Sequence, residues 1–298
     1  MILLTGATGF LGSRLLESLL TNDHEVVALK RSFSNQSRIK NLLNHAKLHI
    51  IDIDQTEPSL VFDQYSIDTI IHTATEYGRS NTPVFRILEA NLILPLQLAE
   101  IGIEHGVTCF INTDSYFNKD NHSYSNLLDY SLSKKSLLSW LSPLSKRLKI
   151  INVVLEHLYG PYDSKLKFVE SLIHQIAIEK VPRVPLTYGH QKRDFVYLDD
   201  AVSAYLKLIE YGHTHDFAFK TFEIGTGRSV QVRDIAETIK TLSNSPSILG
   251  YGDLPYRGDE IMDSKADISQ LKEVGWSPST QLQEGISKIL FQYGIHNV

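Results

Sequence analysis

A glycine-rich run near the N-terminus restricts the fold of this 298-residue chain more than any other feature. The run TGATGFLG follows the apolar residues ILL and precedes SRLLESLLTN, whose apolar positions recur at helical spacing. In a strand–turn–helix unit, Gly6 permits a tight turn, Gly9 lets the backbone approach a diphosphate, and Gly12 lets the helix pack closely on the strand. The helix N-terminus also favours negative charge. This order favours a nucleotide-binding turn over a ligand-free one, and the site is predicted to comprise Gly6, Thr8, Gly9, Phe10, Leu11 and Gly12.

Short apolar runs alternate with longer helical patterns over the first half of the chain, which is typical of parallel βαβ units. Strands are expected at 2–4, 25–31, 47–54, 67–74 and 108–115, and a strand running into a loop is expected over 150–161. Helices are expected at 84–105, bent or broken at Pro95, and from about residue 130 to Pro143. The predicted fold is α/β: a Rossmann-type doubly wound parallel sheet over 1–160, with a smaller C-terminal substrate-binding domain over 161–298. Some later segments are expected to return to the sheet.

The pattern after Gly160 is less regular. A helix is expected at 171–180, a loop with two prolines at 181–189, and a strand leading into a helix at 193–212. Turn-rich sequence follows 221–227, and a final helix closes the chain.

The composition argues against a nucleic-acid-binding, disulfide-rich or membrane-spanning protein. The net charge of −5 gives no broad basic field for nucleic acid, so anionic ligands must be held by a few placed groups. Cys109 is the single cysteine and lies in the apolar run VTCFI, which predicts a buried thiol in a reducing compartment without a disulfide framework or a zinc cluster. No apolar run reaches the length of a membrane span, and the chain opens directly on a strand-like run. A cytoplasmic location without membrane or metal is therefore expected.

The residues that follow the second strand indicate which dinucleotide is bound. An acidic residue there would bond the ribose 2′-hydroxyl and repel a 2′-phosphate. The chain instead has Lys30, Arg31 and Ser32, where Arg31 offers a forked donor to phosphate and Ser32 a hydroxyl. This pattern favours NADPH over NADH, with a solvated basic loop as the alternative. Asp52 and Ile53, at the end of the third strand, are expected near the adenine.

Tyr130 and Lys134 lie one helical turn apart in DYSLSKKS, so both side chains are expected on one helix face. A nearby ammonium stabilises phenolate and is expected to lower the pKa of Tyr130. The lysine also suits the nicotinamide ribose, and the phenol suits proton donation to an oxyanion as hydride arrives. Thr113, near the end of a strand, is placed to hold the substrate oxygen. The pair alone is common in helices, but with the glycine turn it predicts a catalytic set of Thr113, Tyr130 and Lys134.

Eight segments together resemble the extended short-chain dehydrogenase/reductases of the NAD(P)-dependent sugar-nucleotide epimerase/dehydratase superfamily. They are TGATGFLG, IIHTAT, NTDS, YSLSK, LYGP, RDFVYLDD, YRGDE and VGWSP. More narrowly, HTATEYGR, INTDSYF, VLEHLYGP and QKRDFVYLDDAVSAYL resemble the reductases that make CDP-abequose or CDP-paratose. Those enzymes reduce the 4-keto group of a CDP-4-keto-3,6-dideoxyhexose. The resemblance implies a CDP-linked substrate and the triad Thr113, Tyr130 and Lys134; members of the family often form homodimers through two helices of each subunit.

The chain departs from the related 4,6-dehydratases directly after the catalytic threonine. Those enzymes have aspartate and then glutamate there, as acid and base for water elimination. Asp114 is kept here, but Ser115 stands in place of the glutamate. A hydroxyl cannot take an α-proton as a carboxylate does, so dehydratase chemistry is not expected. Asp114 and Ser115 are both expected near the substrate, with Asp114 ordering the loop.

Residues after the fourth strand are expected to face the ligands, because α/β sheets bind ligands beyond the carboxyl ends of their strands. Ala74 and Thr75 are predicted to line the cofactor. Tyr77, Gly78 and Arg79 are predicted to face the substrate.

The remaining substrate residues lie in the second half of the chain. Arg193 and Arg257 match positions where the superfamily grips the substrate diphosphate, which suits bidentate guanidinium contacts. His157, after Glu156, departs from the asparagine usual in relatives; a sugar or phosphate contact and a purely structural role remain equally open. Lys167 is expected near the nucleotide base.

These features favour an NADPH-dependent reductase of a nucleotide-linked keto sugar. An epimerase or dehydratase that recycles bound NAD would need an acidic residue after the second strand and, for dehydration, glutamate at position 115. A regulator that senses NADP without catalysis typically lacks the tyrosine or the lysine, and both are present.

Overall fold

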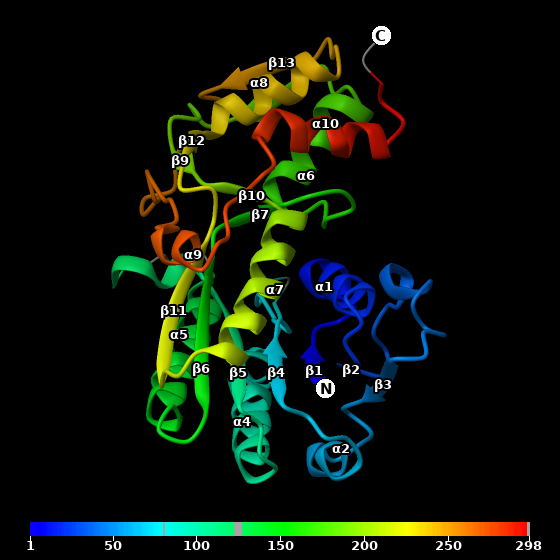
Figure 1. Ribbon diagram of the computed structural model, residues 1–298. Helices are drawn as coiled ribbons and strands as arrows, with labels where there is room; N and C mark the ends of the chain where they lie inside the picture. The colour runs from blue at the N-terminus through cyan, green and yellow to red at the C-terminus, as the bar shows by residue number, and fades with distance from the viewer. Residues whose placement is uncertain (80, 122–126, 297–298) are drawn as a thin grey trace. The chain divides into compact units, whose positions relative to one another are not determined.

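The protein is described here by a computed structural model that covers residues 1–79, 81–121 and 127–296. It divides into two compact units (Figure 1). The first unit comprises Met1–Val154 and Val202–Phe222, and the second comprises Leu155–Ala201 and Glu223–Val298. This division falls six residues before the boundary expected at residue 160, and it assigns a later segment to the first unit.

A seven-stranded sheet runs in the order β11-β6-β5-β4-β1-β2-β3. The strands are β1 (Ile2–Thr5), β2 (Val26–Lys30), β3 (Leu48–Asp52), β4 (Thr69–His72), β5 (Cys109–Ser115), β6 (Lys149–Leu155) and β11 (Phe219–Ile224). The pairs β1–β2, β1–β4, β2–β3 and β4–β5 are all parallel. Because β1 lies between β2 and β4, the strand order reverses at β1, and this reversal marks the nucleotide-binding edge of a doubly wound sheet. The Rossmann-type prediction is confirmed, and β11 joins the sheet as expected of a returning segment.

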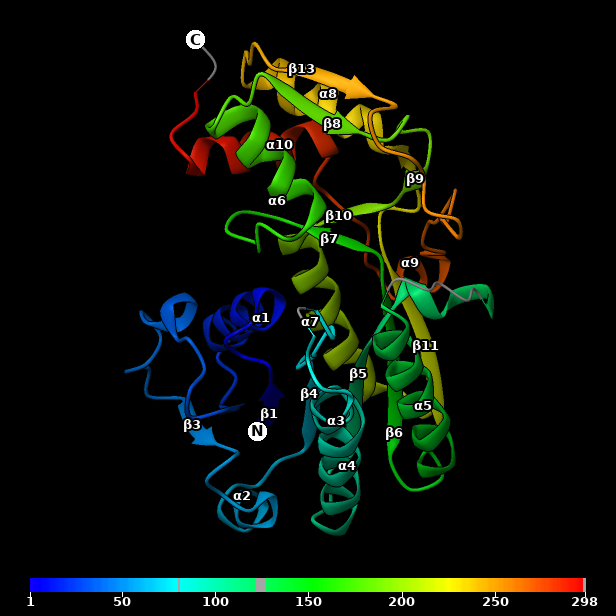
Figure 2. The same ribbon diagram turned by 180° about the vertical axis from the view of Figure 1, so that it is seen from behind.

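Helices cover both faces of this sheet. Helix α1 (Phe10–Thr21) lies in front of the strands in Figure 1, whereas α4 (Leu94–Glu104) and α5 (Leu128–Leu144) lie in front in Figure 2. Shorter helices are η1 (Ser37–Ile39), α2 (Pro58–Gln64) and η3 (Tyr116–Asn121). With both faces covered, β1 is buried at every residue, which explains its uninterrupted apolar sequence.

The helix predicted over residues 84–105 is continuous but irregular. It comprises α3 (Val84–Leu88), a π-helical segment η2 (Glu89–Ile93) and α4. The amide of Leu94 donates to the carbonyl of Glu89, one residue farther back than in an α-helix. Pro95 lies in the first turn of α4 and lacks an amide proton, so the wider turn before it lets the chain continue without a break. In α5, the helix extends past Pro143 to Leu144, one residue beyond the expected end.

The second unit contains three two-stranded pairs. They are β7 (His157–Tyr159) with β10 (Phe195–Tyr197), β8 (Arg183–Leu186) with β13 (Ile248–Tyr251), and β9 (Lys192–Arg193) with β12 (Val230–Gln231). The loop expected at 181–189 is wrong in part, because β8 lies within it. Pro185 is compatible with a strand there, since a two-stranded pair leaves one side of β8 without a strand partner. The segment 150–161, expected as a strand running into a loop, is divided into β6 and β7.

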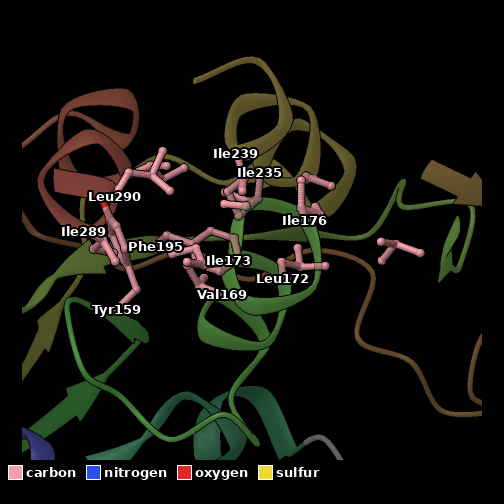
Figure 3. Packing of buried hydrophobic residues seen from close by; sticks show 14 of the residues in the cluster. Tyr159, Val169, Leu172, Ile173, Ile176, Phe195, Ile235, Ile239, Ile289 and Leu290 are labelled. Carbon is pink, nitrogen blue, oxygen red and sulfur yellow. The ribbon is translucent and has the colours of Figure 1, made fainter. Parts of the chain in front are cut away.

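Helices of the second unit enclose its core. They are α6 (Phe168–Leu172), a π-helical segment η4 (Ile173–Ile178), α8 (Val232–Leu242), α9 (Ser269–Glu273) and α10 (Leu282–Gln292); α7 (Leu198–Thr214) begins in this unit and ends in the first. In Figure 3, Phe195 lies among side chains from these helices, such as Val169, Ile173 and Ile289. The sequence reading missed α8, whose start is fixed by reciprocal hydrogen bonds between Gln231 and Asp234. Within the described residues, no helix combines the length and apolarity that a membrane crossing requires.

Candidate functional site

The glycine turn after β1 has the shape of a diphosphate cradle. Gly6 has a φ of 72°, and its amide carbonyl accepts a 2.8 Å hydrogen bond from Gly9. A Cβ on Gly12 would lie 2.1 Å from the Gly6 oxygen, and one on Gly6 would lie 2.6 Å from the Ala74 nitrogen. Helix α1 begins directly after Gly9 with exposed backbone donors at its N-terminus. A side chain at either position would clash with the protein's own backbone, so glycine is needed for the tight turn that leads into α1, and a turn of this kind at a helix N-terminus suits the diphosphate of a dinucleotide.

Hydrogen bonds hold the end of β4 against the end of β1. The Ala74 amide donates to the Thr5 hydroxyl at 3.2 Å, and the Thr73 hydroxyl donates to the Thr5 carbonyl at 2.8 Å. Ala74 thus lies beside the glycine turn, as its predicted cofactor role requires.

The loop after β2 is rich in local ion pairs. Lys30 pairs with Asp52, and the Ser32 amide and hydroxyl both donate to Asp54 at 2.7 and 2.6 Å. These two donations lower the pKa of Asp54. The Ile53 amide donates to the Lys30 carbonyl at 2.8 Å. Asp52, expected near adenine, is therefore engaged by Lys30, and Asp54 is a loop residue that the sequence reading missed.

Arg31 has a different environment from its neighbours in this loop. Its guanidinium carbon lies 4.8 Å from the centre of the exposed Phe33 ring, and its backbone bonds Ser34. The ring holds the guanidinium at the loop surface without neutralising it, so its charge remains available to an anion.

Tyr130 and Lys134 are both buried, with 5% and 1% of their surfaces exposed. The Lys134 ammonium donates to the Thr113 carbonyl oxygen at 2.8 Å. Burial lowers the pKa of Lys134 to about 8, while the charge of Asp114 acts to raise it. A buried ammonium bonded to a carbonyl, and not to a carboxylate, loses its proton more readily than an ordinary lysine.

The environment of Tyr130 corrects one expectation. Burial, followed by the neighbouring Tyr77, raises the pKa of the phenol well above its usual range, and a hydrogen bond with the Ser115 side chain acts in the opposite direction. The Tyr77 ring stacks on Tyr130 with centroids 4.9 Å apart, and Phe117 meets Tyr130 edge-on. The predicted lowering of the Tyr130 pKa is therefore wrong for this structure, because desolvation outweighs the stabilisation of phenolate.

Thr113 lies on β5 and bonds an unexpected partner. Its hydroxyl and that of Tyr205, a fully buried residue of α7, are 2.7 Å apart. Desolvation raises the pKa of Tyr205, so this phenol remains neutral. Tyr205 is 92 residues away in sequence, and no local pattern indicates the pair.

Asp114 is buried below the strand end with both carboxylate oxygens engaged. Its Oδ1 accepts from the Ser115 amide at 2.8 Å and from Asn118 at 2.6 Å, and its Oδ2 accepts from Asn152 at 3.2 Å. Burial raises its pKa, while these donors and Lys134 act to lower it. This arrangement agrees with the loop-ordering role expected for Asp114 and leaves little of the carboxylate for substrate.

The π-helical segment η2 supplies a further buried polar residue, Asn91. Its side-chain amide donates to the Glu76 carbonyl at 2.8 Å and to the Ser133 hydroxyl at 3.0 Å, and its oxygen accepts from the Glu76 amide and the Thr75 hydroxyl. Ser133 in turn donates to the Tyr130 carbonyl at 2.7 Å. Asn91 thus fastens the segment after β4 to the helix that carries Tyr130.

Arg79 and Tyr77 pack beside Tyr130. The Arg79 guanidinium carbon lies 5.3 Å from the centre of the Tyr77 ring, which itself stacks on Tyr130. Tyr77 and Arg79 therefore lie beside Tyr130, and the prediction that 77–79 face the substrate stays a prediction.

The second unit holds the predicted diphosphate residues in different surroundings. Arg193 is 6% exposed, forms an ion pair with Glu260, and donates to the Lys192 carbonyl at 2.8 Å. Arg257 is exposed and begins the turn closed by the Glu260 amide. The YRGDE segment therefore supplies a carboxylate to one predicted arginine and contains the other.

His157 and Glu156 lie at the start of β7. Glu156 is buried and accepts from the Ser264 hydroxyl at 2.9 and 3.0 Å, while His157 Nδ1 lies 3.8 Å from it. Burial lowers the pKa of His157, and Glu156 acts to raise it. Lys167, by contrast, precedes the first turn of α6.

Comparison with known proteins identifies the family. The model of the NAD dependent epimerase/dehydratase family matches residues 2–225. The chain belongs to this family. It is 36% identical to CDP-abequose synthase of Salmonella muenchen over 97% of this chain and 96% of that one, and 33% identical to CDP-abequose synthase of Salmonella typhimurium (strain LT2) over 97% of each. Its fold matches MoeE5 in complex with UDP-glucuronic acid and NAD, with a TM-score of 0.82, 23% identity, and coverage of 98% and 99% of the two chains.

The family assignment confirms the resemblance stated from the sequence motifs. In this family member, the predicted triad Thr113, Tyr130 and Lys134 lies in one unit, with its members linked through β5 and α5. Sequence reasoning did not foresee that the Thr113 hydroxyl is hydrogen-bonded to that of Tyr205.

Proposed function

We propose that this family member is an NADPH-dependent reductase of the 4-keto group of a CDP-linked 3,6-dideoxyhexose, making a dideoxysugar for a surface polysaccharide. The supporting comparison is the full-length similarity to two CDP-abequose synthases at 36% and 33% identity. The structural observation that carries the proposal is the placement of the buried Tyr130 phenol, which stacks on Tyr77 and lies one helical turn before Lys134. A reductase needs a proton donor in this place, and a neutral phenol is the competent form.

The chain's own residues have three tasks in this proposal. Gly6, Gly9 and Gly12 hold the diphosphate of the dinucleotide at the N-terminus of α1. Lys134, fixed by the Thr113 carbonyl, is the cation that bonds the nicotinamide ribose. When bound, NADPH supplies a hydride for the ketone carbon. Tyr130 holds the proton that the resulting alkoxide takes, and its ring is kept in place by Tyr77 and Phe117.

Proton transfer in this direction does not require a lowered phenol pKa. A sugar alkoxide is far more basic than a phenolate, so the transfer from Tyr130 is downhill even when burial makes the phenol a weaker acid. In this proposal Lys134 acts in cofactor binding, and the Tyr130 phenol acts as an acid because it is neutral.

The preference for NADPH is proposed from Arg31. Its guanidinium is held over Phe33, whereas Lys30 is paired with Asp52 and the Ser32 donors are occupied by Asp54. Arg31 is then the group that binds the 2′-phosphate. The variant Arg31→Asp is expected to turn the preference toward NADH, measured as the ratio of kcat/KM for the two cofactors; an unchanged ratio assigns the phosphate contact to another residue.

Epimerase and dehydratase chemistry are less well supported. Ser115 occupies the place of the dehydratase glutamate. No carboxylate base is then present at that position for an α-proton.

The substrate diphosphate is proposed to bind Arg193 and Arg257 of the second unit. Arg193 is buried and paired with Glu260, and Arg257 is an exposed residue three positions before Glu260. Tyr77, Arg79, Ser115, His157 and Lys167 remain proposed substrate residues.

A homodimer is proposed from an apolar surface on the first unit. Leu128, Leu132 and Trp140 of α5 are 46%, 52% and 60% exposed and recur at spacings of four and eight residues. Val84 and Phe85 of the adjacent α3 are also more than half exposed. Helices α3, α4 and α5 lie together in Figure 2. A second copy of this chain suits this surface, because contiguous exposed apolar side chains on helices typically mark interfaces.

Sedimentation tests the dimer directly. Leu132→Glu should convert the dimer to monomer, and Leu254→Glu, at a 45%-exposed leucine of the second unit, should leave it intact. A dimer that survives Leu132→Glu contradicts the proposed interface.

The reductase activity is tested with purified protein, CDP-4-keto-3,6-dideoxyhexose and either NADPH or NADH. Loss of absorbance at 340 nm should be faster with NADPH, and the product should be the corresponding CDP-3,6-dideoxyhexose. Consumption of neither cofactor, with conversion of a CDP-hexose instead, would favour the epimerase or dehydratase alternative.

A further inference from the structure

The threonine of the predicted triad is hydrogen-bonded to a tyrosine that lies outside the triad. The hydroxyls of Thr113, on β5, and Tyr205, on α7, are 2.7 Å apart, and the distance alone does not say which one donates. Helix α7 lies in front of the sheet in Figure 1, whereas α5 lies in front in Figure 2. Because the Thr113 carbonyl accepts from Lys134 of α5 at 2.8 Å, Thr113 is held from both faces of the sheet.

The surroundings of Tyr205 decide which hydroxyl donates. Tyr205 has no exposed surface, and among the described residues Thr113 is the hydrogen-bond partner of its phenol. If Thr113 donated to Tyr205, the phenol proton would be a buried donor without an acceptor, which costs free energy. Thr113 is partly exposed, so its own proton can reach solvent or a ligand. The arrangement that satisfies both hydroxyls has Tyr205 donating to the Thr113 oxygen.

This direction leaves the single hydroxyl proton of Thr113 for a third group. A ketone oxygen has lone pairs and no proton, so it binds only to donors. A hydroxyl that already accepts one hydrogen bond is also a stronger donor in the next, because the bonds of a chain polarise one another. Thr113, with Tyr205 behind it, therefore suits the oxygen of a keto sugar better than an isolated threonine does.

The packing of α7 fixes the Tyr205 ring independently of its hydroxyl. Ala201 and Leu208 lie on the same helix face as Tyr205 and are likewise without exposed surface. The variant Tyr205→Phe therefore keeps the buried ring and removes the hydrogen bond to Thr113.

We propose that Tyr205 is a positioning residue of the reductase, which donates to the Thr113 hydroxyl and thereby directs the Thr113 proton to the ketone oxygen of the substrate. The inference rests on the proposed function and extends it to a residue outside the triad. Thr113 and Tyr205 both keep their protons, and the proton that the reduced sugar takes comes from Tyr130. As hydride reaches the ketone carbon, negative charge grows on the oxygen, so the donation from Thr113 becomes stronger at that moment.

The first test needs no substrate. Protein labelled with 13Cζ-tyrosine gives a signal for each phenol carbon, and the Tyr205 signal is the one lost in Tyr205→Phe. Thr113→Val, which replaces the hydroxyl by a methyl group, should move the Tyr205 signal. Thr113→Ser, which keeps a hydroxyl, should leave it near its wild-type position. A Tyr205 signal that Thr113→Val leaves unchanged overturns the hydrogen bond on which the proposal is built.

A double-mutant cycle gives the second test, with kcat measured for NADPH and CDP-4-keto-3,6-dideoxyhexose. Tyr205→Phe should lower kcat about 3- to 10-fold, the size of one neutral hydrogen bond, with KM for NADPH nearly unchanged. Thr113→Val should lower kcat further, because it removes the donor itself. In the Thr113→Val background, Tyr205→Phe should cost almost nothing, because Tyr205 acts through the Thr113 hydroxyl.

Tyr211→Phe is the matched control, since it makes the same chemical change at a partly exposed tyrosine of the same helix and should leave kcat at the wild-type value. Losses that multiply in the double variant would show that Tyr205 acts independently of Thr113, and they overturn the proposal, as does wild-type kcat in Tyr205→Phe. An inactive wild-type protein overturns the proposed function and the step built on it together. Multiplied losses in an active enzyme overturn the role of Tyr205 alone.

Discussion

Two buried cations, Lys134 in the first unit and Arg193 in the second, are held in opposite ways. Lys134 bonds a neutral carbonyl, and burial lowers its pKa to about 8. Arg193 forms an ion pair with Glu260. The Arg193–Glu260 pair is neutral overall, whereas Lys134 is hydrogen-bonded to a neutral carbonyl and feels only the nearby charge of Asp114, so its protonation can change. The comparison separates a buried cation whose charge is balanced by an ion pair from one whose protonation state can change with pH.

The largest expected change is a loss of stability when the Arg193–Glu260 ion pair is broken. Arg193→Met leaves Glu260, with 12% of its side chain exposed, without its cation, and should lower the free energy of unfolding by about 3–5 kcal/mol. Urea denaturation measures the loss. Arg183→Met, which removes an exposed pair with Asp253, is the control and should cost much less, because solvent screens an exposed pair.

The double variant Arg193→Met/Glu260→Gln should recover much of the loss, because no buried charge is then left alone. If the double variant is as unstable as Arg193→Met, the ion pair is not the reason for the instability.

A smaller effect, of opposite sign, is expected at Lys134. Its pKa falls from the usual 10.5 to about 8, so the cost of burying the ammonium is fully present below pH 8. Between about pH 8 and 10.5 the unfolded chain holds a proton that the folded protein has released, and stability rises with pH. Lys134→Met removes this cost, about 3 kcal/mol at pH 7 before the lost hydrogen bond is counted. Its advantage over wild type should shrink from pH 7 to pH 10.

Paired urea titrations at the two pH values measure that difference, with Lys135→Met as the matched control for loss of one lysine charge from the same helix. A stability gap between wild type and Lys134→Met that stays constant with pH contradicts the picture of a buried ammonium with a lowered pKa.

The smallest effect is expected from Asp114. Its negative charge raises the pKa of Lys134, and it accepts no hydrogen bond from the lysine. Asp114→Asn should therefore move the alkaline limb of kcat/KM for NADPH to lower pH, with a loss of up to about tenfold at pH 8. Asp63→Asn, which removes a surface carboxylate of the same unit, should leave the limb where it is. If Asp114→Asn leaves the alkaline limb of the pH profile unmoved, the charge of Asp114 does not set the pKa of Lys134.

The sequence was informative where the signal is local. The glycine turn, the strand–helix alternation and the Tyr130–Lys134 spacing each involve a few neighbouring residues, and the fold built on them is confirmed. It was uninformative where a contact joins distant segments. Tyr205 reaches Thr113 across 92 residues, and neither residue carries a periodic pattern that predicts the other.

Other misses have physical causes of the same kind. Asn91 lies in a π-helical turn that sequence periodicity does not distinguish from an α-helix. Strand β8 was taken for a loop because prolines usually interrupt strands, and only its pairing with β13 shows otherwise. The sign of the Tyr130 pKa change depends on desolvation, which requires knowledge of burial and is not given by the spacing to Lys134.

The central claim is that a buried, neutral Tyr130 gives its proton to the reduced sugar. The most direct measurement compares wild type and Tyr130→Phe for NADPH oxidation with CDP-4-keto-3,6-dideoxyhexose, together with the Kd for NADPH. The account predicts a fall in kcat of about 100-fold or more in the phenylalanine variant, with NADPH binding nearly unchanged. Turnover by Tyr130→Phe at the wild-type rate would contradict it.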